Sequence, residues 1–63
     1  MNRIRKFRLE AGLTQGQLAS GIKKTTGCIS QYENNIHNPP IPVAKEMAKI
    51  LGCKWTQLFE EDG

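Results

Sequence analysis

Apolar side chains in this chain recur three or four residues apart, in short stretches, most of which end at a glycine, asparagine or proline. This spacing is that of one face of a helix. Nowhere do Val and Ile alternate with polar residues over the length of a strand, so no sheet is expected. A chain of 63 residues buries only about 60% of the surface that its unfolded form exposes. The sequence therefore predicts an all-α fold with a thin core and a single domain over residues 1–63.

Residues at the ends of the apolar stretches predict where the helices begin and end. Gly12 supplies a left-handed stop for a first helix, and Thr14 and Thr25 are good N-caps for the next two. The pair Asn34–Asn35 can end the third helix, because Asn tolerates the left-handed conformation. Asn38–Pro40 then breaks the chain before a fourth helix. Five short helices are expected, over residues 2–11, 15–22, 25–33, 41–51 and 55–60.

The joint between the second and third predicted helices spans only two or three residues, which forces a large crossing angle between them. In this geometry, a helix-turn-helix, the first turn of the second member projects into the DNA major groove. The exposed face of the third helix carries no charge and can exchange hydrogen bonds with base edges. We expect this DNA-binding face to consist of Thr25, Thr26, Gly27, Ser30 and Gln31.

The charge of +3 is unevenly distributed: residues 1–24 contain six basic residues and the single acid Glu10, whereas residues 60–62 are acidic. Such asymmetry suggests one face that meets a polyanion, although solvated helix faces would explain it equally well. No apolar run could span a membrane and no signal core opens the chain, so a cytoplasmic protein is expected. Cys28, Cys53 and His37 match no zinc pattern. The cysteines are therefore interpreted as reduced thiols, and no metal, cofactor or small-molecule ligand is expected.

From Ile4 to Phe59 the order and spacing of several short motifs are shared with one family. These motifs are Ala11–Gln15, Leu18-Ala19, Ile29–Asn34, Asn38-Pro39, Ala48, Leu51-Gly52 and Leu58-Phe59. They resemble the Cro and phage-repressor (lambda-repressor-like) helix-turn-helix family, whose fold is a compact bundle of five helices. The resemblance implies that Gln15 holds a DNA phosphate and braces the start of the third helix. It also implies a phosphate contact for Asn34 and a partly buried ion pair between Arg8 and Glu33, which makes Glu33 a scaffold residue and not an acid catalyst.

The chain departs from the family pattern in its turn and in three helical glycines. Lys23 stands where the family usually has Gly, and a left-handed Lys there costs on the order of 1 kcal/mol; alternatively the second helix runs one residue longer. Gly16, Gly21 and Gly27 lie inside predicted helices, where each costs about 0.8–1 kcal/mol of stability relative to Ala. Gly27 either lets the third helix approach the groove more closely or leaves one base unread, and simple sequence drift is the alternative. The segment after the third helix is poor in Lys and Arg, so it should bind DNA phosphates only weakly.

We interpret the chain as a transcriptional regulator, specifically a repressor that binds a palindromic operator as a homodimer, and not as an enzyme. Ile50 and Trp55 are expected at the dimer interface, with packing of Trp55 inside the core as the alternative. Two other readings remain open. One is an antitoxin or restriction-modification controller with the same DNA chemistry, and the other is a protein-interaction module on the same fold.

Overall fold

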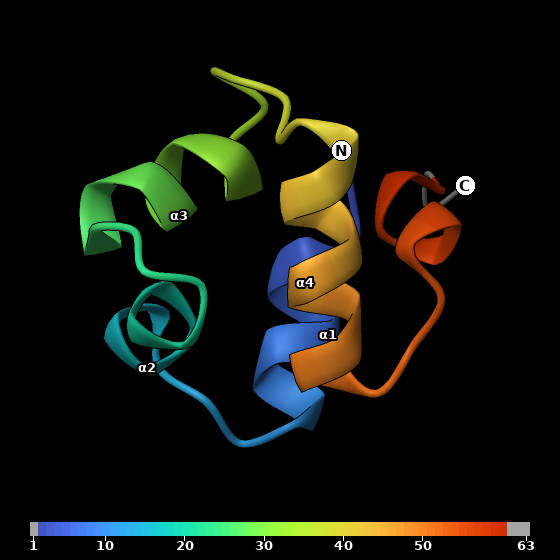
Figure 1. The fold of residues 1–63 in the computed structure, drawn as a ribbon, viewed down its shortest axis with the longest axis horizontal. Coiled ribbons are helices and arrows are strands. Elements are labelled where there is room, and N and C mark those ends of the chain that lie inside the picture. Colours follow the sequence, from blue (N-terminus) through green and yellow to red (C-terminus); the bar gives the residue numbers. More distant parts are fainter. Residues whose placement is uncertain (1, 61–63) are drawn as a thin grey trace.

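The computed structural model describes residues 2–60. Over these residues the chain forms four α-helices and one 3₁₀ helix: α1 (Ile4–Glu10), α2 (Gln15–Gly21), α3 (Thr26–Glu33), α4 (Ile41–Leu51) and η1 (Trp55–Phe59). In the view of Figure 1, α2 and α3 lie at one side of the molecule and η1 at the other, with α1 and α4 between them. The all-α prediction is confirmed, the fourth helix has the predicted bounds, and the other predicted helices are shortened by one to three residues.

The prediction of a fifth α-helix over 55–60 is wrong, because this segment is a 3₁₀ helix. The amide of Gln57 donates to the carbonyl of Lys54 at 3.0 Å and that of Glu60 to Gln57 at 3.4 Å, three residues back in each case. The Gln57 side chain also accepts from the Lys54 amide at 2.9 Å. Such bonding is usual in short helical pieces, at the ends of α-helices and in the segments that connect them.

All four α-helices end in the same backbone motif, in which a left-handed residue reverses the chain. These residues are Gly12 (φ 73°), Lys23 (φ 59°), Asn35 (φ 58°) and Gly52 (φ 73°). After α2, the amide of Lys24 donates to the carbonyl of Ala19 at 2.8 Å, which is the six-residue bond of a Schellman motif. Lys23 is therefore left-handed, and the alternative of a longer second helix is excluded. The predicted stops at Gly12 and at the Asn pair are both confirmed.

The predicted N-caps are also present at the starts of α2 and α3. Thr14 Oγ1 accepts from the Gln17 amide at 3.1 Å, and Gln17 Oε1 accepts from the Thr14 amide at 2.8 Å. This reciprocal pair is a capping box. Thr25 Oγ1 accepts from the Cys28 amide at 3.2 Å. Each cap satisfies a backbone N–H that the helix itself leaves unpaired.

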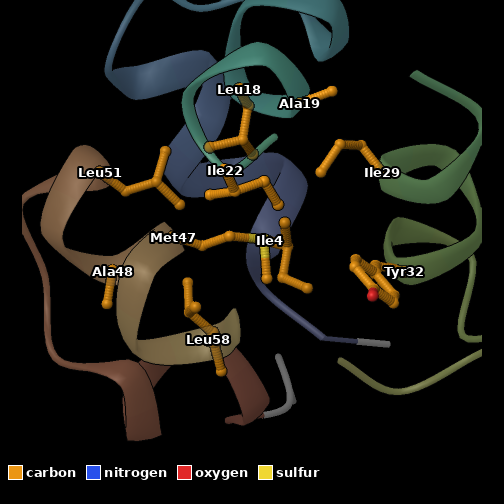
Figure 2. Close-up of a cluster of buried hydrophobic side chains, with 11 residues drawn as sticks. Ile4, Leu18, Ala19, Ile22, Ile29, Tyr32, Met47, Ala48, Leu51 and Leu58 are labelled. Carbon is orange, nitrogen blue, oxygen red and sulfur yellow. The ribbon is translucent and has the colours of Figure 1, made fainter. Parts of the chain in front are cut away.

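The core receives side chains from every helix. Its largest fully buried members are Ile4, Leu18, Ile29, Met47 and Leu58. Figure 2 shows how Leu18 of α2 and Ile22, directly after α2, converge with Met47 of α4 on the same centre. Full burial of one such side chain contributes about 1.5–3 kcal/mol. Because the buried side chains are shared among all five elements, no pair of helices has a separate core, and the crossing of α2 and α3 depends on the whole bundle.

We predict that Lys23→Gly raises the free energy of unfolding by up to about 1 kcal/mol, because Gly adopts the left-handed conformation without steric cost. Lys24→Gly is the matched control, since it removes the same charge at a neighbouring position whose φ is not positive. Urea unfolding followed by circular dichroism measures both variants. The strain at Lys23 would be disproved if the two variants had equal stability.

Candidate nucleic-acid interface

The turn between α2 and α3 consists of residues 22–25, slightly longer than the two or three residues expected. It is anchored by Ile22, whose side chain is buried in the core together with Leu18 and Ala19 of α2 and Ile29 of α3. The two helices are thereby held in a fixed crossing, and the outer face of α3 is turned to solvent. This is the arrangement that places the first turn of α3 within reach of a groove.

The outer face of α3 carries polar, uncharged groups. Thr25, Thr26, Gly27 and Gln31 are exposed and Ser30 is half-buried, whereas Ile29, Tyr32 and Glu33 face inward. Within residues 2–60 the side chains of Thr26 and Gln31 form no hydrogen bond, so their polar groups remain available. The five residues predicted to face DNA therefore share one surface of α3 and its cap.

Gln15 braces α3 at a different place from the one expected. Its Nε2 donates to Glu33 Oε1 at 3.0 Å, which ties the start of α2 to the last residue of α3 and not to the first. The start of α3 is instead approached by Gly16, where an added Cβ would lie 3.5 Å from Thr26 Oγ1. The expectation that Gln15 braces the start of α3 is wrong, because its amide is drawn to the buried carboxylate.

The carboxylate of Glu33 is the centre of a buried polar network. Arg8 Nε donates to Glu33 Oε2 at 2.6 Å, and Arg8 Nη1 donates to the carbonyl of Leu13 at 2.8 Å. The side chains of Arg8 and Glu33 are 9% and 4% exposed. Glu33 thus has charged or polar donors on both oxygens, and within residues 2–60 no group of three or more acidic, His or Cys side chains could hold a metal. Its place in the fold is structural.

Asn34 turns back onto the outer face of α3. Its Nδ2 donates to the carbonyl of Ser30 at 2.8 Å and lies 3.4 Å from Ser30 Oγ. Asn34 and Gln15 also line one open groove, bounded by α1, the start of α2 and the end of α3, which Arg5 and Leu9 line as well. The two predicted phosphate-binding residues therefore meet at a single groove at the end of α3.

Two residues near this interface were not singled out from the sequence. Asn2 Nδ2 donates to the carbonyl of Tyr32 at 2.6 Å and to Asn35 Oδ1 at 2.8 Å, which ties the segment before α1 to the end of α3. Arg5 lines the groove described above. Neither residue lies on an apolar face, so periodicity carries no signal for them.

Tyr32 and the two cysteines lie away from the outer face of α3. A hydrogen bond to Cys28, together with burial, raises the pKa of Tyr32 to about 12, so its phenol stays protonated at neutral pH. Burial raises the pKa of the Cys53 thiol. Both cysteines are half-buried and free.

His37 is exposed in the segment after α3. None of the helices in the described part of the chain is long and apolar enough to cross a membrane.

The two residues expected at a dimer interface lie on α4 and η1. Ile50 is 40% exposed and borders the end of α2, since a Cβ on Gly21 would lie 2.7 Å from Ile50 Cδ1. Trp55 is half-buried. Its ring packs edge-on against Phe59 at 6.2 Å between centroids, and Lys45 Nζ lies 5.9 Å from its centre. Gly21 therefore leaves room for Ile50, and Trp55 is covered in part by its own chain.

Comparison with known proteins identifies the architecture. A helix-turn-helix family model matches residues 4–58. The chain is 33% identical over 58 residues to the uncharacterized HTH-type transcriptional regulator YqaF of Bacillus subtilis, covering 92% of this chain and 76% of that protein. An uncharacterized HTH-type transcriptional regulator of Archaeoglobus fulgidus is 32% identical over 57 residues, covering 90% and 81% respectively. Multiprotein-bridging factor 1c of Arabidopsis thaliana is 39% identical over 51 residues, but these cover 81% of this chain and only 34% of the plant protein.

We predict that Arg8→Met destabilises the fold by about 3–5 kcal/mol, because it leaves the Glu33 carboxylate buried without its charged partner. The double variant Arg8→Met/Glu33→Leu should lose less than the sum of the two single losses. Arg5→Met is the control, an exposed arginine on the same helix, and should change stability little. Urea unfolding measures all four variants, and strictly additive losses would show that the pair is not coupled.

Proposed function

Because the chain belongs to the Cro and phage-repressor helix-turn-helix family of DNA-binding transcriptional regulators, which are not enzymes, we propose that it reads operator DNA with α3. Residues 1–63 would act as a single DNA-binding domain in the cytoplasm. The observation that carries the proposal is the outer face of α3, where uncharged hydrogen-bonding groups are exposed on the second member of the helix-turn-helix. Such groups discriminate between base edges in the major groove.

The roles of the individual residues follow from where they lie. Gln31 can bond adenine bidentately, and Thr26 and Ser30 can serve base or phosphate. Thr25 caps α3 and can also meet a phosphate, while Gly27 allows the backbone to approach the groove closely. On the flank, Gln15 and Asn34 hold phosphates. The Gln15 amide has two N–H groups, and since Glu33 accepts one, the other is available to DNA.

The chain acts as a repressor and binds as a homodimer through a surface that includes Ile50 and Trp55. A single half-site contact from so small a domain seldom competes with the many non-specific sites of a genome. Two-fold pairing would set the two copies of α3 about 34 Å apart, one helical turn of DNA, so the operator should be an imperfect palindrome. An exposed Ile50 beside the end of α2 supports pairing on this side.

The name of the Arabidopsis relative, a multiprotein-bridging factor, favours one second candidate: a module that binds other proteins on the same scaffold. The two candidates differ in their affinity for duplex DNA. Selection from a random duplex pool should yield a palindromic consensus if α3 reads bases. Failure to bind any duplex at low salt would reject the DNA-binding proposal in favour of the protein-binding module.

We predict that Gln31→Ala and Thr26→Ala each weaken operator binding by about 1–3 kcal/mol and leave binding to random duplex nearly unchanged, because base contacts carry the specificity. Gln15→Ala is the comparison, and it should weaken binding to both duplexes by a similar factor, since phosphates carry no direct sequence information. Fluorescence anisotropy titrations measure both affinities. Equal losses on the two duplexes for Gln31→Ala would remove this residue from the reading face.

We also predict that Ile50→Glu gives a folded monomer that loses cooperative binding to the full operator, because a charge is placed in the proposed interface. Ile41→Glu is the control, since Ile41 is exposed at the start of α4, outside that interface and outside the groove that Gln15 and Asn34 line. Sedimentation without DNA reports the oligomeric state, and circular dichroism reports folding. Trp55→Ala should act in the same way, but an unfolded Trp55 variant would instead place its ring in the core. A folded Ile50→Glu variant that still dimerises would contradict the assignment.

A further inference from the structure

The reading helix carries no positive charge. Neither α3 nor the segment of residues 34–40 that follows it contains Lys or Arg, and the acid Glu33 closes the helix. Duplex DNA is nevertheless bound mainly through phosphates that Lys and Arg neutralise. Gln15 and Asn34, the phosphate contacts proposed above, are both neutral. The charge that attracts the backbone at the end of α3 must therefore come from another element.

The groove at the end of α3 contains such a charge. Its walls are formed by Arg5, Leu9, Leu13, Thr14, Gln15 and Asn34, together with the paired Arg8 and Glu33. The charges of Arg8 and Glu33 offset one another at 2.6 Å. Arg5 is exposed, and no acid among residues 2–60 pairs with it. Arg5 thus supplies the whole net positive charge of the groove.

The geometry points to this groove as a DNA phosphate site in which the Arg5 guanidinium pairs with a backbone phosphate that Gln15 and Asn34 also contact. The inference rests on the proposed function and adds the residue that supplies the charge. Asn34 is bonded back to Ser30 and so continues the outer face of α3. A duplex lying along that face therefore brings its flanking backbone to the groove.

The surroundings of Arg5 suit this role. A guanidinium can bind phosphate oxygens with two parallel hydrogen bonds. The apolar side chains of Leu9 and Leu13 on the groove wall displace water on one side of the site, and a lower local dielectric strengthens a charge pair. Arg5 on α1 thus takes the place of the basic residues that the segment after α3 lacks.

Lys6 provides the matched control for this inference. It is the next residue on α1, it carries the same charge and it is also exposed, but it does not line the groove. Its side chain leaves the helix about 100° away from that of Arg5. A loss of net charge alone would affect both positions equally, whereas a phosphate contact would affect only Arg5.

The test compares wild type with Arg5→Gln, Arg5→Lys and Lys6→Gln by anisotropy titrations at several salt concentrations, on operator and on random duplex. For Arg5→Gln, the slope of log K against log salt should become shallower by about 0.9, the value of one released counterion. Its affinity for the two duplexes should fall by the same factor. Arg5→Lys should keep the wild-type slope, and Lys6→Gln should leave both slope and affinity close to wild type.

Three results would overturn the inference. The first is an unchanged salt slope for Arg5→Gln. The second is a change in slope and affinity for Lys6→Gln equal to that for Arg5→Gln, which would show a general charge effect. In either case wild type still binds DNA, so the proposed function would stand while the role of Arg5 would not. The third is absence of wild-type binding to any duplex at low salt, which rejects both. Circular dichroism of each variant establishes that the helices are intact.

Discussion

The ion pair between Arg8 and Glu33 is the interaction on which the orientation of α3 depends. Taking two charges out of water costs several kcal/mol for each ion, and their attraction offsets this only in good geometry with further hydrogen bonds. Here the carboxylate also accepts from Gln15, and the guanidinium also donates to the carbonyl of Leu13. These four groups come from α1, the turn after it, α2 and α3. A shift of any one of the three helices relative to the others would break at least one of these bonds.

The apolar core could not set this arrangement by itself. Hydrophobic burial is non-directional and roughly proportional to area, so a thin core tolerates small rotations of a helix at little cost. A rotation of α3 about its axis would separate Glu33 from Arg8 and strand two buried charges. The bonds from Asn2 to Tyr32 and Asn35 hold the same end of the helix. The network therefore keeps the outer face of α3 turned away from the bundle.

The features that sequence reasoning predicted are those set by neighbouring residues. A left-handed Gly12 or Asn35 and the cap at Thr14 act within one helical turn, so their signals are local and the helix ends follow from them. The choice between an α-helix and a 3₁₀ helix at residues 55–59 was missed. That choice depends on bonds within a five-residue segment and on the packing of Leu58, which the apolar spacing does not distinguish.

The residues of the candidate site also fall into two groups, those set by neighbouring residues and those set by tertiary contacts. The exposed residues of α3 follow from helical periodicity alone, because Ile29 and Tyr32 must face inward. The partner of Gln15 was predicted at the wrong end of α3, since Glu33 lies 18 residues away and their meeting depends on the tertiary crossing. Asn2 and the groove around Arg5 likewise arise only when α1 meets the end of α3. Resemblance to a family supplied one such long-range contact, the pair of Arg8 and Glu33, because both positions match its pattern, but it did not supply the contacts of Gln15, Asn2 and Arg5.

The separation of charge from the reading helix has a physical consequence for the proposed function. Phosphate contacts give sequence-independent affinity that weakens with salt, whereas base contacts give discrimination. On this chain the two sets of groups stand on different elements, with neutral polar groups on α3 and basic groups on α1 and on the turn at Lys23 and Lys24. A change in one element can therefore alter affinity without altering which bases are preferred. The buried pair of Arg8 and Glu33 holds α1 and α3 together and so fixes the distance between Arg5 on α1 and the outer face of α3. In the proposed complex, a backbone contact at Arg5 would therefore set the register in which α3 meets the groove.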